Sequence, residues 1–275
     1  MSASNSPQKR GNRIWVVLLV VSLVVILLAV GFFLWLFLDG SRQPDYSVYH
    51  SSQQTMEATT EPATAGTQST QATTTEALVE NPIDFESLQA QNADIYAWIY
   101  IPNTGIDLPI VQARAGDDDN FYLHKDINRQ YDFKGMIYTQ RANAKDFSDP
   151  VTVIYGHNML DGSMFSNLHM FRDPDFFDEN AYFYIYTPGH ILTYEIVSAY
   201  QYDTRHILNS FDFSKQEVFQ EYLDYLLNPK SMIADVRDGI SLTTDDRIVT
   251  LSTCIERGAA RYLVQGVLIS DERTY

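Results

Sequence analysis

The most reactive side chain in the sequence is Cys254, the only thiol in the chain. It ends an apolar run at 247–254, and the turn-like residues that follow place the thiol at a strand end. A side chain there can be held rigidly and still meet a substrate. Strand alternation puts Thr250, Ser252 and Cys254 on one face, which is the more polar one. A lone cysteine can equally be a buried structural thiol, and this alternative remains open at this point.

A cysteine nucleophile needs a proton-transfer partner and a group that stabilises negative charge. Of the six histidines, His157 has the setting most like that of Cys254, because it follows an apolar run and a glycine at 151–156 (VTVIYG). His50 lies in a polar, low-complexity segment. The remaining four lie in surface-like or helix-like sequence and are read as ordinary histidines: His124, His169, His190 and His206.

Two arginines follow the cysteine, and either one can be a simple surface charge. Arg261 opens the last apolar run, 261–269, and six residues join that run to the one ending at Cys254. If the two runs pair as antiparallel strands, Arg261 lies beside Cys254. A guanidinium there can donate hydrogen bonds to an oxyanion. Arg257, inside the connecting loop, is the alternative.

The elements that must position these side chains are short and mostly extended. Apolar runs rich in Val, Ile, Tyr and Thr, each bounded by turn residues, predict eight strands and a β-barrel or sandwich: 97–101, 108–112, 135–139, 151–155, 182–186, 191–199, 247–254 and 261–269. Two helices are expected as well. One is short, follows Asn81-Pro82 and ends near residue 91; the other begins with a capping box at Ser214 and Glu217 and carries an apolar stripe.

The N-terminal region predicts a membrane anchor. Residues 14–38 carry no charge and are long enough to cross a bilayer as a helix. Lys9, Arg10 and Arg13 precede this run, so residues 1–13 are expected in the cytoplasm and everything after residue 38 outside the cell. A cleaved signal peptide is the alternative, but its apolar region is normally shorter and ends in a small-residue cleavage site.

Composition separates a polar stalk at 39–80 from a folded domain at 81–275. The stalk is rich in Ser, Thr, Gln and Ala without a hydrophobic period, which is typical of disorder. A formal charge of −16 argues against nucleic acid as a partner. One cysteine excludes a disulfide framework and multi-cysteine metal sites. No metal-ligand cluster stands out, the carboxylates at 117–119 are read as a solvated loop, and no cofactor is expected.

Several motifs, in this order behind an apolar N-terminal helix, resemble the sortase family, and class B sortases in particular. They are 94–102 (DIYAWIYIP), 106–112 (IDLPIVQ), 119–123 (DNFYL), 154–159 (IYGHNM), 162–165 (GSMF) and 250–254 (TLSTC) with an arginine opening the next strand. The resemblance spans about 195 residues, from 81 to the C-terminus. It implies an eight-stranded sortase-type β-barrel with an N-terminal helical segment and one helix before the seventh strand.

The resemblance also implies an activity, that of a membrane-anchored cysteine transpeptidase of a Gram-positive cell surface. Cys254, His157 and Arg261 would be catalytic, and Ser252 and Thr253 would contact substrate. The expected partners are surface proteins with a C-terminal, Asn-Pro-x-Thr-like sorting signal, and an amine from a peptidoglycan cross-bridge, lipid II or a pilin lysine. Two alternatives use the same sequence features: an extracellular cysteine protease, and a stalked binding module without catalysis.

Overall fold

The computed structural model describes residues 8–40, 45–50, 78–255 and 258–275. The chain divides into two units, residues 1–45 and 46–275. The first unit contains one helix, α1 (Gln8–Gly40). Its segment Trp15–Leu34 has a mean hydropathy of 3.3 and is long and apolar enough to cross a membrane. The expected apolar N-terminal helix is therefore present.

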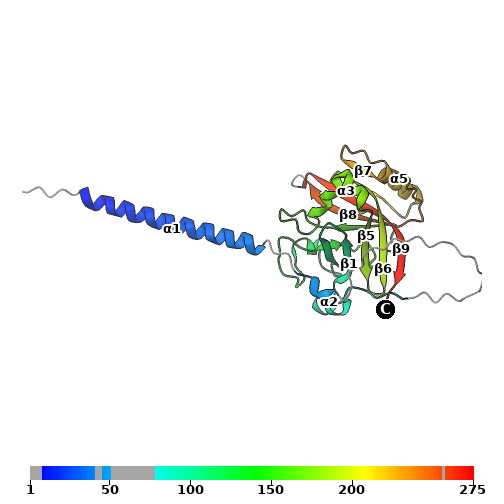
Figure 1. The fold of residues 1–275 in the computed structure, drawn as a ribbon, viewed down its shortest axis with the longest axis horizontal. Coiled ribbons are helices and arrows are strands. Elements are labelled where there is room, and N and C mark those ends of the chain that lie inside the picture. Colours follow the sequence, from blue (N-terminus) through cyan, green and yellow to red (C-terminus); the bar gives the residue numbers. More distant parts are fainter. Residues whose placement is uncertain (1–7, 41–44, 51–77, 256–257) are drawn as a thin grey trace, which may run out of the picture. The chain divides into compact units, whose positions relative to one another are not determined.

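The second unit is built around one sheet that closes on itself (Figure 1). Among the described residues the sheet order is β5-β1-β2-β3-β4-β8-β9-β6-β7, and β5 also pairs with β6, which closes the first eight strands into a barrel. The strands are β1 (Ile95–Ile101), β2 (Ile106–Gln112), β3 (Ile137–Thr139), β4 (Val151–Tyr155), β5 (Tyr182–Thr187), β6 (His190–Tyr202), β7 (Ala234–Val236), β8 (Ile248–Ile255) and β9 (Ala260–Arg273). The eight predicted strands are confirmed. The sequence reading missed β7, which is three residues long and attached to the edge of β6.

Parallel and antiparallel ladders both occur, which decides where the ends of the strands meet. β4 runs parallel to β8, pairing Tyr155 with Ser252, and β8 runs antiparallel to β9. Because the ends of parallel neighbours lie at the same edge of a sheet, the residues that follow β4 and those that end β8 come together.

Apolar residues pack on both sides of this sheet. One buried cluster fills the barrel and includes Trp98, Phe183 and Leu251. A second lies under α5 (Gln216–Leu227), whose buried face carries Phe219, Tyr222, Leu223 and Leu226. The smaller helices are α2 (Phe85–Gln91), α3 (Pro174–Glu179) and α4 (Ile207–Ser210), and the 3₁₀ turns are η1 (Ser47–Tyr49), η2 (Phe121–His124) and η3 (Ser166–Arg172).

Two predicted helix caps are wrong. The helix expected after Asn81 begins later, at Phe85, where the Asp84 side chain accepts a hydrogen bond from the Ser87 amide. The helix expected from Ser214 begins at Gln216, because the Ser214 hydroxyl donates to Asp212 and does not cap the helix. Asp84 therefore caps the first helix in place of Asn81, and the second helix has no side-chain cap.

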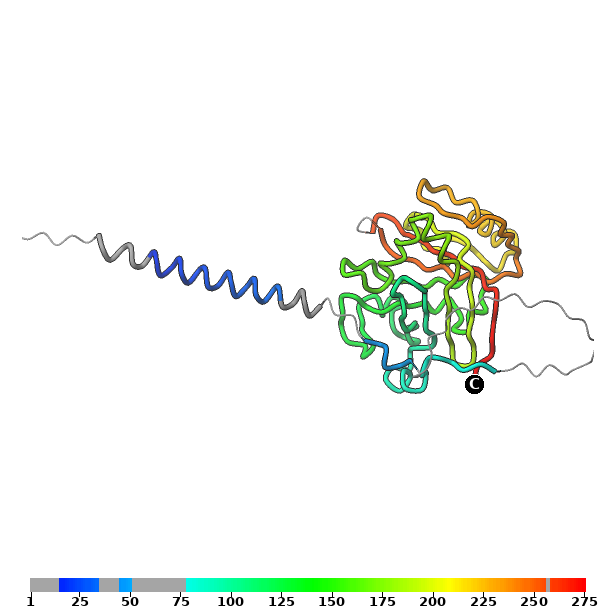
Figure 2. Tube along the Cα trace, viewed as in Figure 1, coloured from blue at the N-terminus to red at the C-terminus, as the bar shows by residue number. Residues whose placement is uncertain are grey.

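Two described parts of the predicted stalk, residues 46–50 and 78–80, belong to the second unit, which begins at Tyr46. Residues 39–40 are the last of α1. Tyr46 is 8% exposed and packs edge-on against Trp98, with ring centroids 6.1 Å apart. His50, set aside in the sequence analysis, packs on the same Trp98, and its Nε2 lies 3.1 Å from an Asp107 oxygen. Val79 forms a parallel bridge with Thr274. In Figure 2 the cyan tube that follows residue 77 runs beside the red C-terminal end. Residues 51–77 lie outside the described part of the chain.

Candidate active site

The antiparallel ladder of β8 and β9 places Cys254 directly opposite Arg261. Both residues are partly exposed, whereas the neighbouring residues 248–253 and 262–267 of the two strands are buried. Among the described residues, Arg261 hydrogen-bonds only to backbone carbonyls, at 3.3 Å to Ala260 and 3.4 Å to Gly258. The predicted pairing of the two runs is therefore present in the structure. Arg257, the alternative, lies outside the described residues.

His157 follows β4, two residues beyond Tyr155. Its Nε2 lies 2.9 Å from the carbonyl oxygen of Leu123. A carbonyl only accepts, so Nε2 carries the proton, and in the neutral ring Nδ1 is the nitrogen free to exchange a proton. Gly156 fits closely before it: a Cβ there would lie 2.6 Å from the Phe165 ring, which explains why a glycine precedes the histidine.

Aromatic rings surround His157. The ring of His124 stacks on it with centroids 5.3 Å apart, and the ring of Phe133 stacks at 6.3 Å. Burial lowers the pKa of His157, the nearby His124 lowers it further, and the Leu123 carbonyl partly offsets both. The imidazole is therefore held preferentially in its neutral form near pH 7.

One pocket of about 320 Å³ joins the predicted site residues. His157, Ser252, Thr253, Cys254 and Arg261 all line it. Ser252 and Thr253 are 4% and 1% exposed, so they form the floor of the pocket and not its rim. The segment after β6 also lines the pocket, with Thr204, Arg205, His206 and Ile207. The five residues singled out from the sequence thus share a single concave surface.

A hydrogen-bonded chain fixes the amide of Asn120 at this pocket. Its Oδ1 accepts from the Tyr138 hydroxyl and from the Gln140 amide, each at 3.0 Å. His206 donates from Nε2 to Gln140 at 2.7 Å, since its Nδ1 accepts from the Asn209 amide. The Asn120 oxygen is thus already used, so its NH₂ group is oriented to donate elsewhere.

A second set of contacts fixes the backbone of the cysteine itself. Asn158 donates from Nδ2 to the carbonyl oxygen of Cys254 at 3.0 Å, and His169 Nε2 lies 3.3 Å from the same oxygen. The His169 ring packs on Tyr262 with centroids 5.2 Å apart. Burial lowers the pKa of His169, and Arg172 adds to the effect. These residues hold the end of β8 in place.

The sequence reading missed several of these supporting residues. His124, His169 and His206 were read as ordinary histidines, yet each one contacts the site or its immediate support. Their only shared sequence signal is that each lies beside a loop between expected strands, which many surface residues also do. His169 and Asn158 lie 85 and 96 positions before Cys254, and contacts over such separations cannot be inferred from one sequence.

An ion-pair network under the site holds the loop that carries Asn120 and Leu123. The buried Asp94 accepts from the Tyr122 hydroxyl and Arg114 Nε, each at 2.6 Å, and also binds Arg129. Arg129 in turn pairs with Asp117 at 2.6 Å. The carboxylate run at 117–119 was expected in a solvated loop; Asp117 is instead a structural partner, and Asp119 pairs with Arg141 at 2.9 Å.

Comparison with known proteins assigns the family. The model of the sortase domain matches residues 99–269. Sortase B of Listeria monocytogenes is 33% identical over 194 residues, which covers 68% of this chain and 74% of that protein. The chain belongs to the sortase B family. Among solved structures, sortase B of Clostridium perfringens is similar with a TM-score of 0.61 and 35% identity, over 68% of this chain and all of that one. The Staphylococcus aureus sortase B–substrate complex matches with a TM-score of 0.60 and 27% identity, over 68% and 85% of the two chains.

Membership settles the choice among the three activities that the sequence left open. This sortase is a cysteine transpeptidase of the sortase B type, and its catalytic domain is extracytoplasmic. A protease and a non-catalytic binding module are thereby set aside. The eight-stranded barrel agrees with the fold that the resemblance implied.

Proposed function

We propose that this sortase cleaves an Asn-Pro-x-Thr-like sorting signal after its threonine and transfers the acyl group to a cell-surface amine. The observation that carries the proposal is the register of β8 and β9, which sets Cys254 opposite Arg261 at a pocket that His157 also lines. A nucleophile, a proton carrier and an oxyanion donor around one cavity are what acyl transfer requires.

In the first half-reaction, Nδ1 of the neutral His157 accepts the proton of the Cys254 thiol, and the resulting thiolate attacks the carbonyl carbon of the signal's threonine. The guanidinium of Arg261 donates to the oxyanion that forms. The carbon–nitrogen bond then breaks, and the leaving amine takes a proton from His157, leaving a thioester on Cys254. The neutral histidine that remains carries its proton on Nε2, held by Leu123.

In the second half-reaction, an incoming primary amine attacks the thioester. His157 accepts the proton that the amine loses, through Nδ1, and the carbon–sulfur bond breaks to restore the Cys254 thiolate. The acceptor class is an amine of a peptidoglycan cross-bridge, of lipid II or of a pilin lysine. No cofactor enters either half, so the electrons and protons balance within the enzyme and its two substrates.

Substrate contacts follow from the pocket lining. Ser252 and Thr253 on its floor are proposed to contact the bound signal. The Asn120 amide, whose oxygen is occupied by Tyr138 and Gln140, is proposed to donate to a backbone carbonyl of the signal. Burial raises the pKa of Tyr138 and of Tyr155, so these phenols stay protonated in the pocket.

The same proposal assigns a membrane topology. Residues 1–13 are cytoplasmic, α1 is an uncleaved single-pass anchor, and the catalytic domain is outside, as the basic residues before the apolar segment indicate. Protease added to intact protoplasts should remove the domain. Resistance of the domain, while a control surface protein is cut, would contradict this topology.

The test of the chemistry is mass spectrometry of the full-length protein with sorting peptides, with and without an amine. A thioester adduct should form on the wild type and be absent from Cys254→Ala, because the chain has no other thiol. His157→Ala should keep its circular dichroism spectrum and lose about 100-fold or more in rate. Activity that survives in Cys254→Ala would overturn the proposal.

A further inference from the structure

Three aromatic rings on residues 124–133, at the end of η2 and before β3, form a row that reaches His157. They belong to His124, Tyr131 and Phe133, here called the ring platform. We infer that the ring platform is the docking surface for the amine acceptor, which it binds as an ammonium ion beside the thioester. This inference rests on the proposed function and names where its second substrate binds.

The platform is exposed and continuous with the site. Tyr131 is 72% exposed and Phe133 is 64% exposed, although both are large aromatic residues. Ring centroids lie 6.2 Å apart for His124 and Tyr131 and 6.1 Å apart for His124 and Phe133. His124 and Phe133 both stack on His157, so an unbroken row of rings leads from solvent to the proton carrier.

The platform is separate from the pocket proposed for the sorting signal. Among the described residues, the pocket lining includes Cys254, Arg261 and His157 but not the three platform rings. His157 lines the pocket and also contacts two rings of the platform. With the acyl chain in the pocket, an amine on the platform would approach the thioester from the side of His157. That is where the attacking amine must lose its proton.

Hydrogen bonds within the loop fix its shape. Lys125 and Tyr131 form an antiparallel bridge, and Asp126 Oδ1 accepts from the amides of Asn128 and Gln130. At the end of the loop Gly135 has φ +58°, and a Cβ there would lie 2.3 Å from the carbonyl oxygen of Leu123. A rigid loop presents the rings at a low entropic cost of binding.

Charge favours a cationic occupant. Each of the three cationic side chains of the loop is engaged: Lys125 over the Phe121 ring, Arg129 with Asp117, and Lys134 with Asp161. The faces of exposed aromatic rings attract ammonium ions. Residues 81–275 carry 15 Lys and Arg against 29 Asp and Glu, so the field of the domain also draws cations. A primary amine arrives near neutral pH as such a cation.

The decisive variant is Tyr131→Ala, because Tyr131 contacts His124 and is mostly exposed. The full-length protein in lipid nanodiscs is given a sorting peptide and increasing triglycine amide, and transfer and hydrolysis products are separated by chromatography. The KM for triglycine amide should rise about fivefold or more, as expected for a lost cation–π contact. Tyr131→Phe, which keeps the ring, should restore it.

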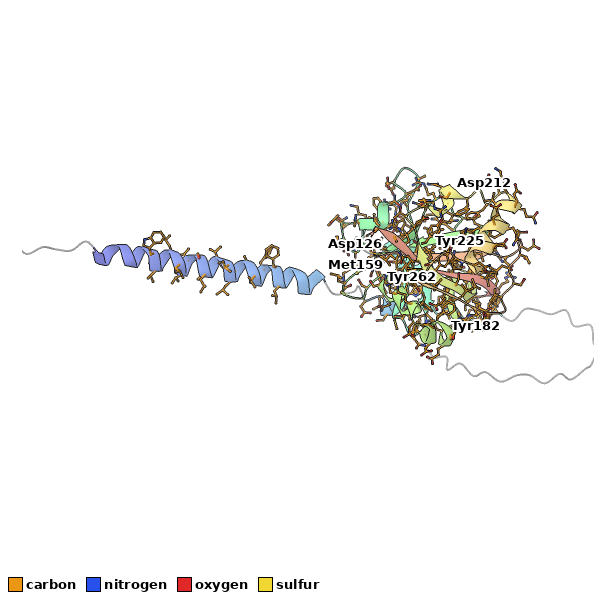
Figure 3. All side chains as sticks on the ribbon, turned by 90° about the horizontal axis from the view of Figure 1, so that it is seen from above. Asp126, Met159, Tyr182, Asp212, Tyr225 and Tyr262 are labelled. Carbon is orange, nitrogen blue, oxygen red and sulfur yellow. The ribbon has the colours of Figure 1, made fainter. Side chains whose placement is uncertain are left out.

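Tyr182→Ala is the matched control, since Tyr182 is also an exposed tyrosine, 43% accessible, but starts β5. In Figure 3 it lies well away from Asp126 of the platform loop and from Met159, which follows His157 by two residues. It should leave the KM for the amine unchanged. If Tyr131→Ala kept a KM for triglycine amide within twofold of wild type, the inference would be overturned. It would also be overturned if the rate of thioester formation fell as much as amine transfer, because the rings would then bind the sorting signal.

A binding measurement separates failure of this inference from failure of the proposed function. Saturation-transfer NMR of triglycine amide with full-length Cys254→Ala requires no catalysis. Signals should be strong, weaken in the Cys254→Ala, Tyr131→Ala double variant, and be absent for N-acetyl-triglycine amide, which has no ammonium. If the wild type forms no thioester but these differences hold, the proposed function fails and the amine site stands. Equal signals from both peptides would overturn the amine site.

Discussion

The Nε2 nitrogen of His157 donates to the carbonyl oxygen of Leu123 at 2.9 Å, while the face of the same ring lies on His124. The hydrogen bond fixes the tautomer, and the stacked histidine makes a second positive charge unfavourable. Leu123 and His124 are adjacent in η2, so one short turn sets both the orientation and the proton affinity of the proposed acid–base group.

Replacing His124 should therefore shift the pH dependence of catalysis. Like charge from His124 helps to lower the pKa of His157, so His124→Phe, which keeps an aromatic ring, should raise it. The limb of the kcat/KM profile that reports His157 should move to higher pH, as should its NMR titration. His190→Gln, at an ion pair with Asp271 on the barrel, is the control and should move neither. A limb that stays in place would show that the stacked histidine does not tune His157.

Arg261 should not tolerate replacement by lysine. A guanidinium offers several donors in a fixed plane, and one ammonium cannot reproduce them. Arg261→Lys should reduce kcat/KM for a sorting peptide about 100-fold, the scale for losing an oxyanion donor. Arg257→Ala is the matched control and should retain most activity. The opposite pattern, with Arg257→Ala inactive and Arg261→Ala near wild type, would move the oxyanion role to Arg257.

Asp94 should be important for stability. Its side chain is 4% exposed and binds Tyr122, Arg114 and Arg129. Burial raises its pKa, but the hydrogen bonds from Tyr122 and Arg114 outweigh burial and leave the pKa below its ordinary value. Because the folded form binds this proton less readily than the unfolded chain, the stabilisation is present above about pH 4 and is lost as the pH falls through the folded pKa.

Asp94→Asn removes the buried carboxylate that binds Arg114, 53% exposed, and Arg129, 25% exposed. It should lower the free energy of unfolding by about 3 kcal/mol, because a buried charge loses its hydrogen bonds and ion pairs. Urea denaturation followed by circular dichroism measures it. Asp203→Asn, at the exposed pair with Arg205, should leave the midpoint nearly unchanged. Equal midpoints for the two variants would mean that the buried network adds little.

The barrel could be predicted from the sequence because its strands are short apolar runs bounded by turn residues. The pairing of Cys254 with Arg261 followed from a six-residue connection, which leaves an antiparallel ladder as the simple outcome. The ring platform, and the roles of Asn158 and His169, could not be predicted. The contacts of Asn158 and His169 with Cys254 depend on the parallel β4–β8 ladder, which brings together segments that are far apart in the chain. The platform contacts join the segment before β3 to the residue that follows β4.

The N-terminal segment was missed for a different reason. A polar, low-complexity composition averages over residues 39–80 and hides a few residues that pack. Tyr46 and His50 both pack edge-on against one partner, Trp98, whose Nε1 donates to Asp107 at 2.5 Å. The carbonyl of Tyr49 also accepts from the Asp84 amide at 2.8 Å, which ties the segment to the start of α2.

The segment around Tyr46 should therefore stabilise the catalytic domain. Tyr46 is buried against Trp98, and burial raises its pKa, so it stays a neutral, apolar contact. In the full-length chain Tyr46→Ala should lower the free energy of unfolding by about 3 kcal/mol, the usual cost of removing a buried aromatic ring. Val48→Ala, two residues away and 73% exposed, should change it little.

A chain that begins at residue 81 should unfold at a lower urea concentration than one that begins at residue 45. If both truncated chains and Tyr46→Ala matched the parent in urea, the packed segment would contribute no stability, and the domain would begin where its composition suggests.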